Sequence, residues 1–370
     1  CPDCGREVKV IHEENWFFKL SEFGNKLLAY YDEHPNFIRP QIRENEIRSF
    51  IEGGMHDLSV SRTAFDWGIP LPFDPEHVTY VWVDALINYL TALGYGSDDT
   101  TLLERFWPAN FHFVGKDIIR FHCVIWPAML MAAGMECPRH VFAHGFLMAA
   151  DGSKMSKSKG NALYPRDLIE RYGVDAYRYY FLSDVTFGSD ANIGHDRITQ
   201  VYNADLANTY GNLFSRVSNM VIKYFDGQVP EVPAEFGLEE NPLSEIAEGL
   251  YERYAACMND IDFGGASAHV MELLHRANLY VEESAPWNLA KNEETQGELA
   301  FVLYNALEVC RIAALLLAPF MPNTSTELWR RLGLEDPCAV DNAAELALWG
   351  GLPAGNEVTK GDALFPRLEK

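Results

Sequence analysis

A loop in the middle of the chain concentrates side chains suited to binding phosphate. Between Asp151 and Gly160, three lysines and three serines occupy ten residues. Lysine ammonium groups pair with phosphate oxygens. A mobile loop can hold them against the charge that moves from the α-phosphorus of a triphosphate to the departing pyrophosphate. A solvated basic turn is the commoner explanation of a lysine-rich loop, so the surrounding sequence has to decide between the two.

Ser156 and Lys159 also have the spacing of the nucleophile motif of β-lactamases and penicillin-binding proteins. The Ser-Asp-Asn and Lys-Thr-Gly motifs that accompany it in those enzymes do not occur at usable positions. We therefore set the hydrolase interpretation aside.

Apolar runs on either side of this loop predict a parallel sheet. Val78–Val83 and Phe111–Val114 each lead into a helical pattern, and a third short run lies at Val141–His144. Repetition of strand and helix is typical of parallel sheets with buried strands, whose ligands bind beyond the carboxyl ends of the strands. There, Gly115 lets a ligand approach the backbone, and Asp117 is suited to ribose hydroxyls.

The remaining elements are predicted to be mostly helical. An amphipathic helix is expected between Trp16 and about Gly53, broken by Pro35 and Pro40, and a strand at Asp57–Arg62. After about residue 195 the spacing of apolar residues becomes helical over 198–224, 242–259, 265–284 and 296–317, which predicts a helix bundle. The segment after about 336 looks loosely packed.

The five residues Lys154–Ser158 read Lys-Met-Ser-Lys-Ser, which is identical to the KMSKS signature of the class I aminoacyl-tRNA synthetases. Tyr80–Tyr89 and the Gly-Lys-Asp-x-x-x-x-His segment from Gly115 to His122 resemble the methionyl-tRNA synthetases in particular. Singly, Trp82 is explained as a core residue, Asp117 as a helix cap and His122 as a buried histidine. Their combination, in the expected order over about residues 1–335, carries the resemblance.

The resemblance implies an α/β fold followed by an all-α part. The implied domains are the end of a zinc-knuckle insertion with linking helices (1–55), the second half of a Rossmann-type parallel sheet (56–150), the KMSKS loop with a stem-contact region (151–195), an anticodon-binding helix bundle (196–335) and a C-terminal tail (336–370). The implied reaction is ATP-dependent activation of methionine to methionyl-adenylate, followed by transfer to tRNA(Met), with Mg²⁺ accompanying ATP.

Specific residues follow from the resemblance. The methionine pocket is matched by Trp82, Ala85, Tyr89, Ile118 and His122. ATP contacts are matched by Gly115, Asp117, His144, Gly145, Lys154, Met155, Ser156, Lys157 and Ser158, of which Lys154 and Lys157 are catalytic. Methionine must be selected by apolar shape and sulfur–aromatic contact, which suits Trp82 and Tyr89. Leu86 departs from the Pro of several family members and puts the detailed pocket shape in doubt.

Asn212, Arg216 and Trp287 match the anticodon-reading positions of the family. Amide and guanidinium groups read unpaired bases by hydrogen bonds, and an aromatic ring stacks on them. Without the resemblance, the polar positions of the helix at 198–224 would be read as its solvated side. The formal net charge of −23 also argues against RNA binding. A large enzyme can nevertheless confine its positive charge to one groove.

Two family features are incomplete. The His-x-Gly-His signature is absent before the KMSKS loop, and Asn192–His195 lies after it, so we treat that match as a coincidence at a loop or helix start. Cys1 and Cys4 form half of a zinc knuckle, for which a metal-free turn is the commoner explanation. We therefore expect a fragment whose N-terminal part is missing or supplied as a separate chain.

Composition limits the remaining choices. Seven cysteines, mostly scattered, favour a reducing compartment, and we expect a cytoplasmic protein. No run of eighteen uncharged apolar residues occurs, so no membrane partner is expected. Two alternatives remain open: a class I synthetase for another apolar amino acid such as leucine or cysteine, and a catalytically inactive tRNA-binding paralogue.

Overall fold

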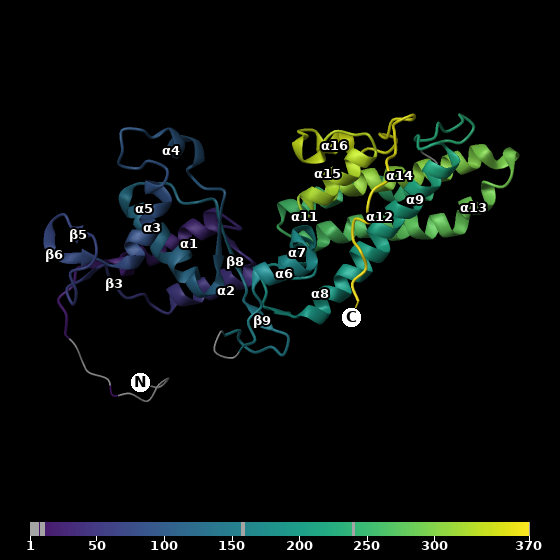
Figure 1. Cartoon of the computed structure of the whole chain (residues 1–370). Coiled ribbons are helices and arrows are strands. Elements are labelled where there is room, and N and C mark those ends of the chain that lie inside the picture. Colours follow the sequence, from purple (N-terminus) through teal and green to yellow (C-terminus); the bar gives the residue numbers. More distant parts are fainter. Residues whose placement is uncertain (1–6, 8–11, 157–159, 239–240, 370) are drawn as a thin grey trace. The chain divides into compact units, whose positions relative to one another are not determined.

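The chain forms two compact units in this computed structural model, Cys1–Phe146 and Leu147–Lys370 (Figure 1). The structure describes residues 7, 12–156, 160–238 and 241–369. Each unit has its own hydrophobic core. The first is mixed α/β and the second is almost entirely helical, which confirms the predicted fold class.

A three-stranded parallel sheet lies at the centre of the first unit. Its order is β2 (Ile38–Arg39), β8 (His140–His144) and β7 (Phe111–Gly115), and the register pairs Gly115 with His144. The last residues of β7 and β8 therefore meet at one edge. The strands at β7 and β8 were predicted, whereas β2, two residues long, carries too little pattern to be detected.

Helices surround this sheet and bury their apolar faces against it. The core contains Leu27, Ile47, Leu86, Trp126 and Val141, each at most 1% exposed. The helices of this unit are η1 (Leu20–Phe23), α1 (Gly24–Glu33), α2 (Gln41–Glu52), α3 (Val81–Thr91), α4 (Thr101–Phe106), η2 (Lys116–Ile118), the π-helix η3 (Phe121–Ile125) and α5 (Trp126–Ala133).

The predicted strand over Val78–Val83 is wrong in its second half. Strand β6 (Asp74–Thr79) ends before Tyr80, and the Val83 amide donates to the Tyr80 carbonyl at 2.8 Å, which closes the first turn of α3. A short apolar run fits a strand and a buried helix start equally well. Moreover, β6 belongs to an antiparallel sheet rather than to the parallel one.

The antiparallel strands of the first unit are short. The sheet containing β6 has the order β4–β6–β5, and a separate pair joins β1 to β3. The predicted strand at Asp57–Arg62 is confirmed as two pieces interrupted at Val60. The bounds are β1 (Phe17–Phe18), β3 (Leu58–Ser59), β4 (Ser61–Arg62) and β5 (Pro70–Leu71).

The second unit begins with a parallel strand pair and continues as a helix bundle. Strand β9 (Leu147–Ala149) pairs with β10 (Ala191–Ile193), and α6 (Pro165–Tyr172) and α7 (Val174–Ser183) lie between them in sequence. The segment Asn192–His195 spans the end of β10 and the first residue of α8.

The helix predicted from Ile198 to Tyr224 is confirmed, and its middle part is a π-helix. Its parts are α8 (His195–Val201), the π-helix η5 (Tyr202–Gly211) and α9 (Asn212–Tyr224). π-Helical turns are rare and frequently occur at functional sites. No sequence pattern had indicated this one.

Long helices α12 (Phe263–Ser284) and α14 (Gln296–Leu317) pack against each other and against α9 (Figure 1). The helix predicted over 242–259 is divided into α10 (Pro242–Ala247) and α11 (Leu250–Asn259), because Gly249 adopts a left-handed conformation with φ of 63°. The stretch Glu293–Leu317 is long and apolar enough to cross a membrane, yet 94% of its apolar window is buried inside this unit. It serves as the core helix of the bundle.

The C-terminal segment is better packed than predicted. It is largely irregular, but Leu352, Val358 and Phe365 are buried in the core of the second unit, and Asn203 exchanges two hydrogen bonds of 3.0 Å with Leu368. These anchors are six and seven residues apart, too few and too widely spaced to form a periodic pattern in the sequence. The remaining elements are α13 (Pro286–Leu289), η6 (Glu293–Thr295), α15 (Pro322–Arg331), η7 (Pro337–Ala339) and α16 (Ala343–Leu346).

A buried ion pair attaches this segment to α14. Glu308 and Arg311 are 0% and 2% exposed and lie 2.6 Å apart. Arg311 also donates to the carbonyls of Leu346 and Leu348, and Glu308 accepts from the Gly351 amide at 2.8 Å.

Replacing Glu308 with Ala should therefore lower the free energy of unfolding by about 3–5 kcal/mol, because it leaves a guanidinium buried without its counter-ion. Chemical denaturation of the wild type and the variant measures this. Glu283→Ala, which breaks a more exposed pair with Arg276, is the control and should cost less than about 1 kcal/mol. Equal losses in the two variants would contradict this role of the pair.

Candidate active site and RNA-binding face

The carboxyl ends of β7 and β8 bring together the predicted ATP-binding residues of the first unit. Gly115 lies opposite His144 in the sheet register, and Gly145 follows directly. A Cβ atom on Gly115 would lie only 2.5 Å from an Asp117 carboxylate oxygen. A larger residue at this position would displace the carboxylate, so the glycine is required for the close approach of Asp117 to the strand.

Helix α3 presents the predicted methionine-pocket residues along one face. Trp82, Ala85 and Tyr89 are spaced by three and four residues, which places them one above another on a helix. The Trp82 ring stacks on Phe121 of η3, with 4.0 Å between ring centroids and 19° between planes. Leu86 is only 1% exposed and points into the core instead.

Tyr89 and His122 form the polar part of this group. The Tyr89 hydroxyl lies 2.9 Å from Nε2 of His122, and His122 Nδ1 lies 3.1 Å from the Ile118 carbonyl. Because a carbonyl only accepts, Nδ1 carries the proton and Nε2 accepts from Tyr89. Burial lowers the pKa of His122, so it stays neutral near pH 7. The structure thus brings Trp82, Ala85 and Tyr89 of α3 next to Ile118 and His122 of η2 and η3.

His112 belongs to the same cluster and was missed. Its ring lies 4.2 Å from that of Tyr89 and 6.1 Å from that of His122. It is 6% exposed, and its Nε2 has no hydrogen-bond partner. Burial, together with His122, lowers its pKa to about 4. The signal was available, because alternation along β7 places His112 on the same buried side as Val114.

The predicted phosphate-binding loop lies in the second unit, and its described residues are contacted by a side chain that the motif does not include. Asn161 accepts from the Ser156 amide at 2.9 Å and donates to the Ser153 hydroxyl at 3.0 Å and the Lys154 carbonyl at 3.4 Å. Lys154 is exposed, and Met155 packs against the core. Asn161 therefore joins the residues before the loop to those after it.

Lys157 and Ser158 lie outside the described residues. The loop and the Gly115 edge belong to different units. That Lys157 and Trp82 face a shared nucleotide therefore stays a prediction.

The predicted anticodon readers lie on α9 and α13. Asn212 is exposed, and Arg216 forms an ion pair of 3.6 Å with Glu282 of α12. Trp287 is 41% exposed, and it follows Ala285, whose left-handed backbone (φ of 43°) ends α12. These side chains have the types and exposure that base recognition requires.

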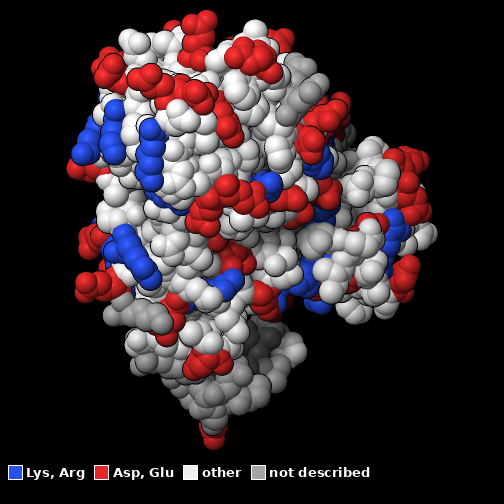
Figure 2. Space-filling model, turned by 90° about the vertical axis from the view of Figure 1, so that its right-hand side faces the viewer, with Lys and Arg blue, Asp and Glu red and all other residues white. Residues whose placement is uncertain are grey.

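Charge on the molecular surface is mixed. Figure 2 shows acidic side chains over much of one face, with lysines and arginines in smaller groups between them. Any attraction of RNA by this chain must therefore be local rather than a property of its net charge of −23.

Cys1 and Cys4 lie outside the described residues, so the structure leaves the predicted zinc site untested. Within the described ranges, no three His, Cys, Asp or Glu side chains converge in a way that could hold a metal ion.

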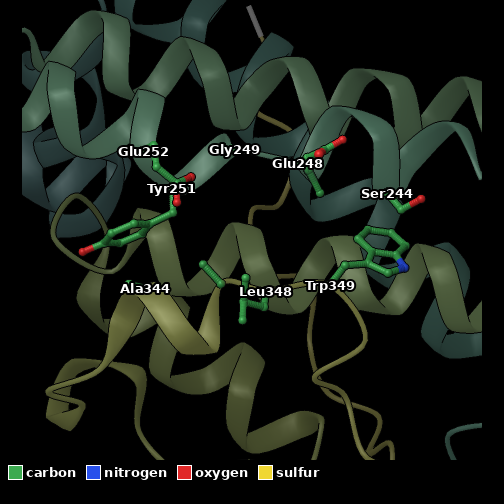
Figure 3. A pocket seen from close by; sticks show the side chains of 10 residues that line it. Ser244, Glu248, Gly249, Tyr251, Glu252, Ala344, Leu348 and Trp349 are labelled. Atoms are coloured by element: carbon green, nitrogen blue, oxygen red, sulfur yellow. The ribbon is translucent and has the colours of Figure 1, made fainter. Parts of the chain in front are cut away.

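A hollow of about 460 Å³ lies between α10, α11 and α16, and none of the predicted site residues lines it (Figure 3). Tyr251 and Trp349 line it together with the carboxylates of Glu248 and Glu252. Carboxylates repel phosphate, so this hollow does not suit ATP or RNA.

Comparison with known families gives two matches that together cover nearly the whole chain. A family described as tRNA synthetases class I (M) matches residues 1–218. A second, described as the anticodon binding domain of methionyl tRNA ligase, matches residues 229–370.

Individual proteins similar to this chain belong to the same family. The methionine–tRNA ligase of Caldanaerobacter subterraneus is 47% identical over 369 residues, and that of Bacillus subtilis is 45% identical over 374 residues. All of this chain is covered, but only 57% and 55% of those proteins, so the chain spans little more than half their length. A structure of Mycobacterium tuberculosis methionyl-tRNA synthetase in complex with methionyl-adenylate has a TM-score of 0.91 at 44% identity, covering 99% of this chain and 71% of that one.

The buried His112 leads to a prediction about acid stability. Its pKa of about 4 lies below the ordinary value of 6.5, so the unfolded chain binds a proton between these values and the folded chain does not. Stability should therefore rise with pH over that interval, by up to about 3 kcal/mol from this group.

His112→Phe should flatten this dependence at little cost at pH 7, because the replaced Nε2 has no partner. Denaturation between pH 4 and 7.5 measures the slope, with exposed His56→Gln as the control. An unchanged slope in His112→Phe would show that another group is responsible.

Proposed function

The chain belongs to the methionyl-tRNA synthetases of class I, and from this premise we propose that it is the larger part of a methionine–tRNA ligase. The full-length protein activates methionine with ATP, forming methionyl-adenylate and releasing pyrophosphate, and then transfers methionine to the 3′ end of tRNA(Met). The alternative of another apolar amino acid is not favoured by any feature of the chain.

The observation that carries this proposal is the contact of α3 with η3. The indole of Trp82, stacked on Phe121, and the phenol of Tyr89, held by His122, offer aromatic surfaces with one oriented hydroxyl. A thioether side chain needs such surfaces, since sulfur makes favourable contacts with aromatic rings. The selectivity available is about 1–3 kcal/mol per methylene, so close analogues of methionine should also be activated.

Activation requires positioning and charge stabilisation more than proton transfer. We propose that Gly115, Asp117, His144 and Gly145 hold the adenosine part of ATP. Lys154 and Lys157, with the backbone and hydroxyls around Met155, Ser156 and Ser158, would neutralise the phosphates.

We also propose that Asn212 and Arg216 hydrogen-bond to anticodon bases while Trp287 stacks on one of them. The ion pair with Glu282 keeps the Arg216 guanidinium oriented before RNA arrives. When RNA binds, hydrogen-bond acceptors on a base would replace the Glu282 carboxylate, so the Arg216 guanidinium would have a partner both with and without RNA.

The remaining parts of the proposal concern what accompanies the chain. Mg²⁺ would enter with ATP, since it is bound mainly through phosphates and water. Zinc would use Cys1 and Cys4 with ligands from the rest of the protein. The rest includes an N-terminal part, joined or supplied as a separate chain. A cytoplasmic location is supported by the five described cysteines, all of which are free thiols.

Methionine-dependent exchange of pyrophosphate into ATP tests the function. The chain alone should be inactive, and the chain together with its N-terminal part should catalyse exchange with methionine but not with leucine or cysteine. Exchange with one of those amino acids instead, or tRNA binding without any exchange by the completed protein, would contradict the proposal.

Asn161 provides a prediction about the loop. In the completed enzyme, Asn161→Ala should reduce the rate constant of exchange roughly tenfold, because it removes three hydrogen bonds around the loop, while changing the KM for methionine less than about twofold. Asn161→Asp keeps the acceptor for the Ser156 amide and should lie in between. An unchanged rate in Asn161→Ala, or equal changes in rate and KM, would count against a positioning role.

A further inference from the structure

The C-terminal segment builds a small polar hollow beside α9. The Thr359 amide donates to the Arg331 carbonyl at 2.9 Å, and Arg331 Nη1 donates to the Asp362 carbonyl at 2.8 Å. A Cβ atom on Gly361 would lie 2.2 Å from the guanidinium carbon of Arg331. A side chain at this position would push the guanidinium aside, so Gly361 lets the backbone lie against it, and the hydrogen bond to the Asp362 carbonyl holds it there.

The hollow has a volume of about 70 Å³. This exceeds the space of one water molecule, roughly 30 Å³, and is far too small for a nucleoside. Its polar lining consists of Ser215, Ser218 and Asn219 from α9, Arg331 from α15, and Lys360 and Asp362 from the C-terminal segment.

The charged side chains of this lining are Arg331, Lys360 and Asp362, of which only Lys360 offers a positive charge left unpaired within the described part of the chain. Arg331 is paired with Glu327. Hydrogen bonds from Arg330 and Arg331 lower the pKa of Glu327 to about 2. Lys360 is exposed and forms no ion pair with any described residue. The Asp362 carboxylate opposes an anion, whereas the hydroxyl of Ser215 and the amide of Asn219 can donate to one.

The position of the hollow relates it to the anticodon readers. Ser215 and Asn219 lie three and seven residues after Asn212, spacings that place all three on neighbouring turns of one side of α9. At 1.5 Å per residue, Ser215 is only about 4.5 Å along the helix from Asn212.

We propose that this hollow binds a phosphate group of the RNA strand whose bases meet Asn212 and Arg216, with Lys360 as its principal cation. The proposal rests on the proposed function. The phosphate contact would fix the register of the strand without reading its sequence, and it supplies local positive charge in a chain whose net charge would repel RNA.

The test is the salt dependence of tRNA binding by the full-length protein. One phosphate contact contributes about 0.7–0.9 to the slope of log K against log[salt]. Lys360→Ala should therefore lower the slope by about that amount and weaken binding about five- to eightfold at 0.1 M relative to 1 M salt. The loss should be the same for tRNAs with different anticodons. Methionine-dependent pyrophosphate exchange should not change.

Matched variants make the result specific. Lys360→Arg should restore the slope, and Asp362→Asn should tighten binding. Lys26→Ala removes one charge from an exposed position in the first unit and should leave the slope unchanged. Equal slopes in Lys360→Ala and Lys26→Ala would overturn the proposal.

Inorganic phosphate serves as the second probe. If Lys360→Ala weakens binding of inorganic phosphate in calorimetry but not of tRNA, the site is one for the free anion and the RNA proposal fails. If the wild type exchanges pyrophosphate normally and the Lys360→Ala variant gives either of these negative results, only the phosphate site is overturned. Absence of exchange in the wild type overturns the proposed function.

Discussion

The pairing of β7 with β8 is the constraint on which the catalytic side of the molecule depends. Because the strands are parallel and in a register that sets Gly115 against His144, their last residues emerge at one edge. Everything predicted to contact the nucleotide from this unit follows within two residues of that edge. A slip of one residue would turn His112 from the buried to the exposed side and remove it from the Tyr89 cluster.

The acidity of the chain and the proposed RNA binding are compatible, because net charge acts over the whole surface whereas binding depends on charges near the contact. At physiological salt, charges separated by more than about 8 Å are largely screened. The carboxylates spread over the surface in Figure 2 therefore contribute little at a particular point on α9. A few cations held against a helix dominate there, provided that backbone contacts fix them, as they do for Arg331.

Sequence alone predicted those parts whose signals are regular or composed of many residues. The strands β7 and β8 and the long helices of the bundle follow from apolar spacing. The site residues came from resemblance, because no spacing rule would join Trp82 to His122 across forty residues. The structure brings them side by side, but which of them touch substrate stays a prediction.

The failures have specific physical causes. The start of α3 was predicted as strand because an uninterrupted run of apolar residues fits both the two-residue period of a strand and the 3.6-residue period of a helix. The packing of Leu352, Val358 and Phe365 was missed because an irregular chain anchors residue by residue, and the Glu308–Arg311 pair that attaches it contains charged residues normally expected outside. Asn161 was missed because its role depends on hydrogen bonds across a loop, which no motif records.

The π-helical stretch η5 separates two tasks of one long helix. Each of its turns closes from residue i to i+5 and so takes up more residues than an α-helical turn. The side chains of α9 therefore point in directions that a continuous α-helix running on from α8 would not give them. Ile198 and Val201 keep α8 seated in the core, while the π-helical turns set the direction in which Asn212 and Arg216 of α9 point. Lengthening or shortening this stretch by one residue would turn α9 by about 100° about its axis. Leu213, Phe214 and Val217, each at most 2% exposed, would then leave the core, so the length of η5 fixes which residues of α9 the bundle leaves exposed.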